Sequence, residues 1–214
     1  MMSYTNVTIR EVTQNDHDLE SILEQVALIW TDAQKSVFLP MIQRVNPALF
    51  ESLYSDPEFL SMERLRKAFT CTVRNFYKLA IACNEERVLG YILFIPVTFS
   101  DESEEFLNRV FSGHGDDLSV ADRTEFKNYV STDQLYVEEL MVDSSAQRSG
   151  IGTLLMEYVL NYGHNHGFSQ CVVTTPEHNE NACKFYEKQG FSKLKTFLNK
   201  DDLSIVAFQK SISS

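Results

Sequence analysis

The stretch that decides the fold is Leu135–Val142, LYVEELMV, followed by Gln147–Gly152, QRSGIG, and Thr153–His166, TLLMEYVLNYGHNH. The first part is built from the aliphatic, β-branched and aromatic residues that strands favour. Apolar residues then recur at the spacing of one helix face, namely Ile151, Leu154, Leu155, Tyr158, Val159 and Tyr162. Gly163 and Gly167, with His164 and His166 beside them, mark the end of that helix. The stretch therefore predicts a strand, a tight turn and a helix.

The turn carries the first sign of chemistry. Gly150 and Gly152 let the backbone approach a ligand without a Cβ in the way. The first N–H groups of a helix have no partner within it, and the helix dipole adds partial positive charge there. These features favour a phosphate or pyrophosphate, for which Gln147 and Arg148 supply further donors. The alternative is a turn whose glycines serve geometry alone.

Two familiar phosphate loops do not fit this turn. No Gly-Lys-Ser/Thr is present, which excludes a P-loop. Ser149–Gly152 also lacks the third glycine of the Rossmann fingerprint, because Leu155 stands in its place.

The turn instead resembles the Gln/Arg-x-x-Gly-x-Gly/Ala signature of the GNAT superfamily of acyl-CoA-dependent N-acetyltransferases, through Gln147, Gly150 and Gly152. A second stretch, Asn179–Phe191, is similar to the family's Asn-x-x-Ala-x-x-φ-Tyr-x-x-x-Gly-Phe motif. Both motifs occur in the family's order and at about its spacing. The resemblance covers about Leu135–Phe191, whereas the N-terminal half agrees only in the order of its elements.

The resemblance implies one α/β domain over residues 1–214, with a GNAT-like acyl-CoA N-acyltransferase fold. Its central sheet is mixed, mostly antiparallel and flanked by helices. The implied acyl donor is acetyl-CoA, with its pyrophosphate on the turn and its pantetheine arm and thioester carbonyl on the backbone of Met141 and Val142. Asn179 is expected to cap its helix first and to contact the donor second. The implied donor-binding set is Met141, Val142, Gln147, Arg148, Ser149, Gly150, Ile151, Gly152, Thr153 and Asn179.

Three residues are catalytic candidates. The resemblance assigns Tyr186 to protonating the departing thiolate, and the alternative is a tyrosine that only packs on the apolar face of its helix. Glu138 and Glu139 resemble the acidic pair of polyamine and amino-sugar acetyltransferases, in which such residues remove the amine proton directly or through water. Adjacent strand residues point to opposite faces, so we expect one of them to act and favour Glu138. A bulge would reverse the faces, and transfer of the proton to water without either glutamate stays open.

The rest of the chain completes the expected order of elements. Strands are predicted at Val7–Arg10, Phe76–Cys83, Val88–Phe99, Cys171–Thr175, Phe191–Leu198 and Leu203–Gln209. A first helix carries Leu19 to Trp30 with a cap at Asn15-Asp16, and Trp30 is interpreted as a packing residue. A further helical region is broken near Pro40, Pro47 and Pro57, and its last helix contains Phe59 to Phe69. In the resembled superfamily, the first two helices commonly wall the acceptor site.

Residues 100–133 form a long insertion before the central strand, with helix candidates at Asp101–Phe111 and Val120–Tyr129 and His114 between two glycines. An insertion of this length is typical of a functional lid or an interface. A solvated surface excursion is the alternative, and His114 is then an ordinary loop histidine.

Composition excludes several classes of protein. The formal net charge of −11 argues against nucleic-acid binding and is compatible with cationic substrates. No run approaches the length of a membrane span, and Met1–Arg10 has no apolar leader segment. Cys71, Cys83, Cys171 and Cys183 are scattered, which predicts reduced, mostly buried thiols in a cytoplasmic protein without a metal site.

We therefore expect an N-acetyltransferase that acts on a small cationic amine of the polyamine or amino-sugar type, by direct attack in a ternary complex. A homodimer is compatible with this expectation. The alternatives are a protein or peptide amine acetyltransferase, a non-catalytic acyl-CoA-binding module whose insertion binds a partner, and a Rossmann-type nucleotide protein.

Overall fold

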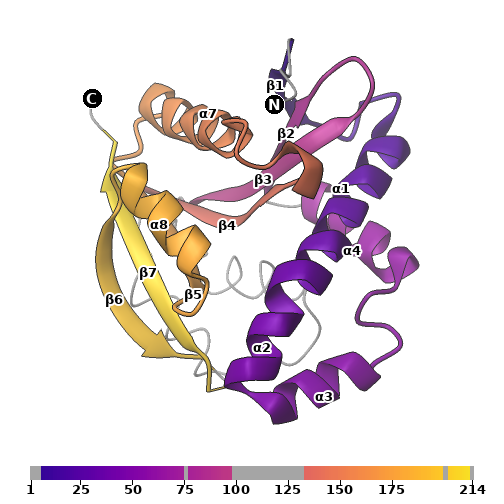
Figure 1. Cartoon of the computed structure of the whole chain (residues 1–214). Coiled ribbons are helices and arrows are strands. Elements are labelled where there is room, and N and C mark those ends of the chain that lie inside the picture. The colour runs from indigo at the N-terminus through magenta and orange to yellow at the C-terminus, as the bar shows by residue number, and fades with distance from the viewer. Residues whose placement is uncertain (1–5, 75–76, 98–132, 200–201, 213–214) are drawn as a thin grey trace. The chain divides into compact units, whose positions relative to one another are not determined.

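The computed structural model describes residues 6–74, 77–97, 133–199 and 202–212. Figure 1 labels its elements along the chain. The helices are α1 Leu19–Ala33, η1 Gln34–Phe38, α2 Leu39–Val45, α3 Pro47–Ser55, α4 Met62–Arg74, η2 Ser144–Ala146, α7 Ile151–Asn165 and α8 Glu180–Lys188. The strands are β1 Thr8–Val12, β2 Lys78–Cys83, β3 Val88–Val97, β4 Gln134–Val142, β5 Gln170–Pro176, β6 Ser192–Leu198 and β7 Ser204–Ser211.

The strands form one mixed sheet in the order β1-β2-β3-β4-β5-β7-β6. The β1–β2, β5–β7 and β6–β7 pairs are antiparallel, whereas β4 and β5 are parallel and joined by the crossover helix α7. This is the mixed sheet flanked by helices that the resemblance implies. Strands β3 and β4 and helix α7 each pass from one of two compact units of the chain into the other.

The first unit comprises Met1–Arg74, Lys78–Leu93 and Glu139–Tyr158. Its helices α1, η1 and α2 follow one another without a break, as Figure 1 shows. Helix α1 buries Ile22, Leu23, Val26 and Ala27 at helical spacing. Strand β2 is buried at its four central positions, and an Asx turn in which Asn84 Oδ1 accepts the N–H groups of Glu86 and Arg87 leads into β3.

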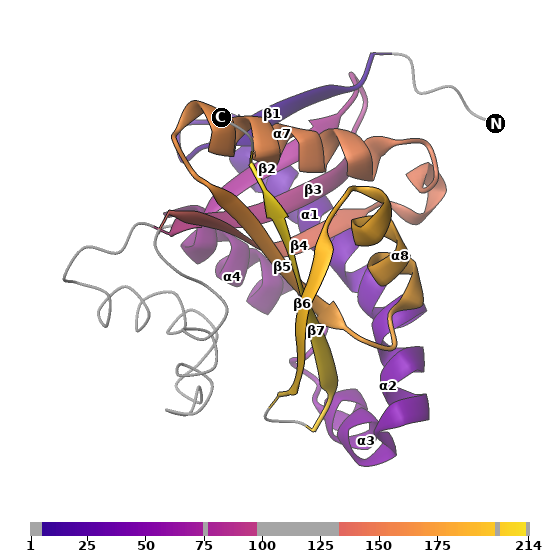
Figure 2. The ribbon, with the colours of Figure 1, turned by 90° about the vertical axis from the view of Figure 1, so that its left-hand side faces the viewer.

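The second unit comprises Asn75–Tyr77, Phe94–Glu138 and Val159–Ser214. In it, α8 lies along the strands β5, β7 and β6, as Figures 1 and 2 both show. The Tyr186 ring of α8 contacts the Phe208 ring of β7, with 5.8 Å between ring centroids. Cys171 and Val173 of β5, which are buried on the same face of the sheet as Phe208, complete the core beneath α8.

Several expectations about the N-terminal helices need correction. The N-cap of α1 is Asp18, and its side chain makes no capping bond, while Asp16 Oδ2 accepts the N–H of Thr13 instead. Pro40 does not break the helical run, because the run widens into the π-turn η1 just before it and so accommodates the proline ring and its missing N–H. Phe59 precedes α4, which begins at Met62.

The predicted apolar face of α7 is displaced. Leu154 is 41% exposed, whereas Met156, absent from the predicted face, is fully buried. At 100° per residue, the buried Ile151, Leu155, Met156 and Val159 centre on a direction about 120° from Leu154. Periodicity placed the helix correctly but misplaced its inward face.

The remaining expectations concern cysteines, metals, membranes and the insertion. Cys171 is buried, but Cys83 and Cys183 are partly exposed, and the Cys71 side chain is outside the description. Within the described residues, no helix is long and apolar enough to span a membrane, and no cluster of His, Cys, Asp or Glu could hold a metal ion. Residues 98–132, with both helix candidates of the insertion and His114, lie outside the described residues.

Candidate active site

Hydrogen bonds and an ion pair between polar side chains fix the start of the turn between β4 and α7. Asp143 accepts the N–H and the hydroxyl of Ser145. Arg87 forms an ion pair with Asp143, with 3.1 Å between Nη1 and Oδ2, and donates to Ser145 Oγ at 2.8 Å. The Gln147 amide donates to the Val142 carbonyl oxygen at 3.3 Å, and Ser149 Oγ donates to the Ala146 carbonyl oxygen. These bonds fix the path of the chain before any ligand binds.

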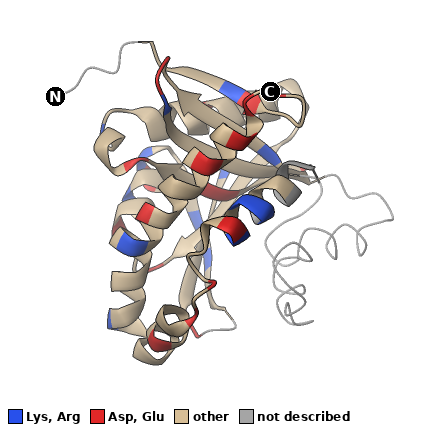
Figure 3. Cartoon of the chain, turned by 90° about the vertical axis from the view of Figure 1, so that its right-hand side faces the viewer, with Lys and Arg blue, Asp and Glu red and all other residues tan. Residues whose placement is uncertain are grey.

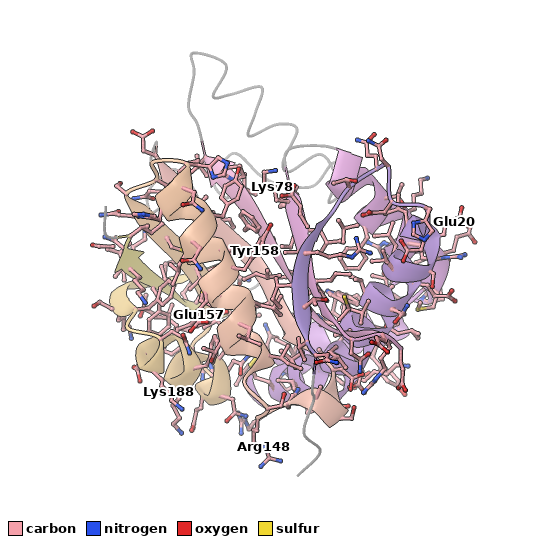
Figure 4. All side chains as sticks on the ribbon, turned by 90° about the horizontal axis from the view of Figure 1, so that it is seen from above. Glu20, Lys78, Arg148, Glu157, Tyr158 and Lys188 are labelled. Carbon is pink, nitrogen blue, oxygen red and sulfur yellow. The ribbon has the colours of Figure 1, made fainter. Side chains whose placement is uncertain are left out.

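At Gly150 the positive φ of the backbone, and not a lack of space for a side chain, favours glycine. Gly150 has φ +93°, and a Cβ built on it would meet nothing within 4 Å. Arg148, just before it, also has a positive φ of 61°, and Figure 4 shows its side chain extending outward from the turn. Helix α7 starts at Ile151, so the N–H groups of Ile151 and Gly152 have no partner inside the helix. The N-terminus of α7 therefore lies beside open space, where an anion can bind.

The C-terminal part of β4 does not pair with β5. The parallel β4–β5 ladder runs from the Gln134–Gln170 pair to the Val137–Val173 pair and stops there. Strand β4 nevertheless continues to Val142, and burial falls from complete to partial beyond Val137. The backbone of Glu138 to Val142, which includes Met141, is therefore not paired with β5 and can bind an extended chain.

Glu139 is held from two directions within the first unit. Trp30 Nε1 donates to Glu139 Oε1 at 3.0 Å, and the Tyr91 hydroxyl donates to Oε2 at 2.8 Å. Burial first, and the adjacent Glu139 carboxylate second, raise the pKa of Tyr91 well above its ordinary value, so Tyr91 remains a donor. Two donors to one carboxylate fix its position.

Glu138 has different surroundings. It is partly buried, and it forms no hydrogen bond or ion pair with any described residue. Desolvation of its carboxyl group raises the pKa from 4.5 to about 7. A carboxyl group without a partner and with a pKa near neutrality can take up or release a proton under physiological conditions.

Tyr186 combines a buried ring with an unused hydroxyl group. The residue is 6% exposed, and its ring lies among Phe185, Phe191 and Phe208. Its hydroxyl makes no hydrogen bond within the described residues. Burial is the main reason that its pKa lies above the ordinary value, so the phenol keeps its proton.

Both ends of α8 are capped as the sequence predicts. Asn179 is the N-cap, and its Oδ1 accepts the Ala182 N–H at 3.3 Å. At the other end Gly190 has φ +83°, and Phe191 N–H donates to the carbonyl of Tyr186 while Gly190 N–H donates to that of Glu187. This is a Schellman motif, and the Tyr186–Phe191 ring contact is its usual apolar partner. The Gly-Phe pair thus holds Tyr186 in place.

Sequence reasoning missed four residues around these groups. Trp30 packs edge-on against Phe59, as a core residue does, but it also bonds Glu139, and Tyr91 is the second donor. Gly90 allows β3 to approach β4, because a Cβ there would lie 2.8 Å from the Met141 carbonyl oxygen. Gln34 is a buried polar residue on the helical run. The available signals were a glycine inside a strand pattern and a glutamine four residues after Trp30.

Comparison with solved structures shows the same fold in many acetyltransferases. An N-acetyltransferase from Staphylococcus aureus Mu50 aligns with TM-score 0.60 and 15% identity over 98% of this chain and 100% of its own. The ribosomal-protein-alanine N-acetyltransferase from Brucella melitensis aligns with TM-score 0.59 and 16% identity over 95% and 99%. An aminoglycoside 6'-N-acetyltransferase complexed with coenzyme A aligns with TM-score 0.57 and 14% identity over 97% and 98%.

A search of curated proteins finds no match. The model of the acetyltransferase (GNAT) family, however, matches residues 42–191, which include the turn, both glutamates, Asn179 and Tyr186. That match spans well over half of the 214 residues. The chain therefore belongs to the acetyltransferase (GNAT) family.

Proposed function

We propose that this protein transfers an acetyl group from acetyl-CoA to the primary amine of a small cationic molecule, within a ternary complex on a single catalytic domain. The observation that carries the proposal is the turn before α7, where Gly150 with φ +93° faces open space at a helix N-terminus. It lies inside the family match and suits a pyrophosphate.

Each part of the acetyl-CoA donor is assigned to particular residues of the chain. The N–H groups of Ile151 and Gly152, with Arg148, Ser149 and Thr153 beside them, bind the pyrophosphate. The backbone of Met141 and Val142, on the side that does not pair with β5, binds the pantetheine arm in the manner of an added strand. Gln147 supports this site indirectly, because its amide already bonds the Val142 carbonyl. Asn179 acts first as the cap of α8.

The proton that the leaving thiolate requires comes from Tyr186. The role needs a protonated group, and burial keeps the Tyr186 phenol protonated. It also needs a donor that no other group occupies, and the hydroxyl has no partner within the described residues. The ring contacts with Phe191 and Phe208 hold the hydroxyl in a fixed direction.

The proton that the attacking ammonium must lose goes to Glu138. Its pKa of about 7 leaves it ionised above neutrality and basic enough to accept a proton. Glu139 is the less suitable base, because both of its oxygens already accept hydrogen bonds. Its fixed negative charge instead favours a cationic acceptor near the end of α1.

The acceptor class rests on charge. The net charge of −11 favours cationic molecules. Figure 3 shows that, on the described ribbon, Lys and Arg are interspersed with Asp and Glu. Among the fold neighbours, an aminoglycoside acetyltransferase and a ribosomal-protein-alanine acetyltransferase are equally similar, so the fold alone does not choose between small amines and protein amines. A protein-amine acetyltransferase is therefore the second candidate.

Thermal unfolding with acetyl-CoA, NAD and ATP, followed by thiol release with an amine panel, tests the proposal. The panel contains polyamines, amino-sugars and peptides with free α-amino groups. We expect stabilisation by acetyl-CoA alone and thiol release with small amines. Release with peptides only would support the second candidate. Stabilisation without any release would indicate a non-catalytic acyl-CoA-binding module.

A further inference from the structure

The helical run that starts with α1 contains a π-turn, and the turn has a local cause. Leu39 N–H donates to the carbonyl of Gln34, five residues earlier. Pro40 follows directly, has no N–H to donate, and would crowd the carbonyl four residues before it in a regular α-helix. Widening the preceding turn relieves this conflict. Single π-turns inside helices are frequently found at functional sites.

The first residue of this π-turn is a buried glutamine. Gln34 is 8% exposed, and its carboxamide forms no hydrogen bond with any described residue. Within the described residues, the only fully enclosed side-chain atom without a hydrogen bond is Asp18 Oδ1. The carboxamide atoms of Gln34 therefore still reach open space. A mostly buried carboxamide that bonds no described residue, but that an outside molecule can reach, is able to hydrogen bond a ligand.

Helix geometry places Gln34 beside Trp30. Residues four apart in a helix lie on the same face, about 6 Å apart along the axis. Trp30 sits on the inward face of α1, between the Glu139 carboxylate and the Phe59 ring. Gln34 is thus one turn beyond the residue that bonds Glu139, on the same buried face.

We infer that Gln34 selects the acceptor, by hydrogen bonding a neutral polar group of the molecule whose amine is acetylated. A carboxamide both donates and accepts, so it suits a hydroxyl or an amide, and its lack of charge gives a second ammonium little attraction. Phe59 and Trp30 supply an apolar wall on the same face. The inference rests on the proposed function and narrows it from amines in general to hydroxylated amines of the amino-sugar type.

The test compares glucosamine, which has hydroxyl groups near its amine, with putrescine, which has none. Gln34→Leu removes both hydrogen-bonding atoms at similar volume, and Gln34→Glu substitutes a negative charge. We expect wild type to prefer glucosamine. Gln34→Leu should lower kcat/KM for glucosamine at least tenfold, mainly through KM, and leave putrescine within about twofold. Gln34→Glu should move the preference towards putrescine.

Gln25→Leu in the same helix is the matched control. Gln25 Oε1 accepts the Val88 N–H at 2.8 Å, so this glutamine has a structural partner, whereas the Gln34 carboxamide bonds no described residue. Gln25→Leu should lower the melting temperature and leave the ratio of the two substrates unchanged, whereas Gln34→Leu should not lower the melting temperature.

The outcomes separate the two proposals. Turnover with an unchanged glucosamine-to-putrescine ratio in Gln34→Leu would overturn the role of Gln34 and leave the proposed function standing. A fall in melting temperature with that variant would equally assign Gln34 to structure. Absence of thiol release with every amine in wild type would overturn the proposed function and this inference with it.

Discussion

Glu138 and Glu139 are adjacent in the chain, yet the fold gives them opposite chemical properties. Two donors hold the Glu139 carboxylate, from residues 109 and 48 positions away in sequence. Glu138 has no such partner among the described residues, and desolvation raises its pKa to about 7. Adjacent acids in different environments can take different roles in an active site. The residue scale is therefore where the roles of the two glutamates can be tested apart.

The first prediction concerns the pH dependence of catalysis. In wild type, kcat/KM should rise with pH through about 7, because Glu138 must be ionised to accept a proton. Glu138→Gln should remove this rise and lower kcat/KM at pH 8 by roughly 100-fold or more. Glu139→Gln is the matched control and should keep the rise with pH. If the rise with pH persisted in Glu138→Gln but disappeared in Glu139→Gln, the roles of the two glutamates would be exchanged.

The second prediction concerns the folding stability that the same carboxyl group affects. Below pH 4.5 Glu138 is protonated in both the folded and the unfolded chain, so its burial costs nothing there. Between pH 4.5 and about 7 only the unfolded chain ionises, and wild type should lose up to about 3 kcal/mol. Urea unfolding should therefore show Glu138→Gln equal to wild type at pH 4 and more stable at pH 8. Equal stability at both values would contradict the raised pKa.

Tyr186 gives the third prediction. Tyr186→Phe keeps the ring that packs on Phe191 and Phe208 and removes only a hydroxyl that bonds no described residue. The melting temperature and the affinity for acetyl-CoA should stay close to wild type, while kcat falls by roughly 100-fold. Steady-state kinetics together with calorimetric binding of acetyl-CoA measure both quantities. A large loss of affinity would place Tyr186 in donor binding instead.

At the scale of elements, helix α7 supplies its own control for the role of the turn. Gly150 precedes the helix with φ +93°, and Gly167 follows it with φ +79°; a Cβ on either would meet nothing within 4 Å. Valine at either position should therefore strain the backbone similarly. Gly150→Val should also abolish stabilisation by acetyl-CoA, which for wild type amounts to about 2.7 kcal/mol at 100 times Kd. Gly167→Val should retain that stabilisation, and its loss in both variants would mean that strain alone explains the effect.

The elements also show what local sequence could predict. The strand–turn–helix unit, the cap at Asn179 and the stop at Gly190 follow from signals within a few residues, and the structure has all three. The predicted cap at Asn15-Asp16 and the predicted burial of Leu154 were wrong, because several nearby residues could satisfy the same pattern. The π-turn at Gln34 follows from a conflict with Pro40 that propensities do not express.

At the scale of the molecule, the candidate site depends on contacts that no local pattern encodes. The motifs predict Gln147–Gly152, Asn179 and Tyr186 directly, since each motif lies on one short stretch. The bond from Trp30 to Glu139 joins residues 109 positions apart, and nothing near either residue indicates it. The end of the β4–β5 ladder at Val137 likewise depends on how two strands diverge. Long-range pairing is thus the part of the site that required a structure.

The net charge of −11 leads to the last prediction, which belongs to the whole chain. A negative field attracts a cationic acceptor and repels the anionic acetyl-CoA, and added salt screens both effects. Raising NaCl from about 0.05 M to about 0.5 M should increase KM for a doubly charged diamine by roughly threefold to tenfold. KM for acetyl-CoA should stay constant or fall under the same conditions. A neutral osmolyte at equal osmolality controls for changes in water activity. If salt raises both KM values together, loss of stability rather than screening of the acidic field is responsible, because screening must act with opposite sign on ligands of opposite charge.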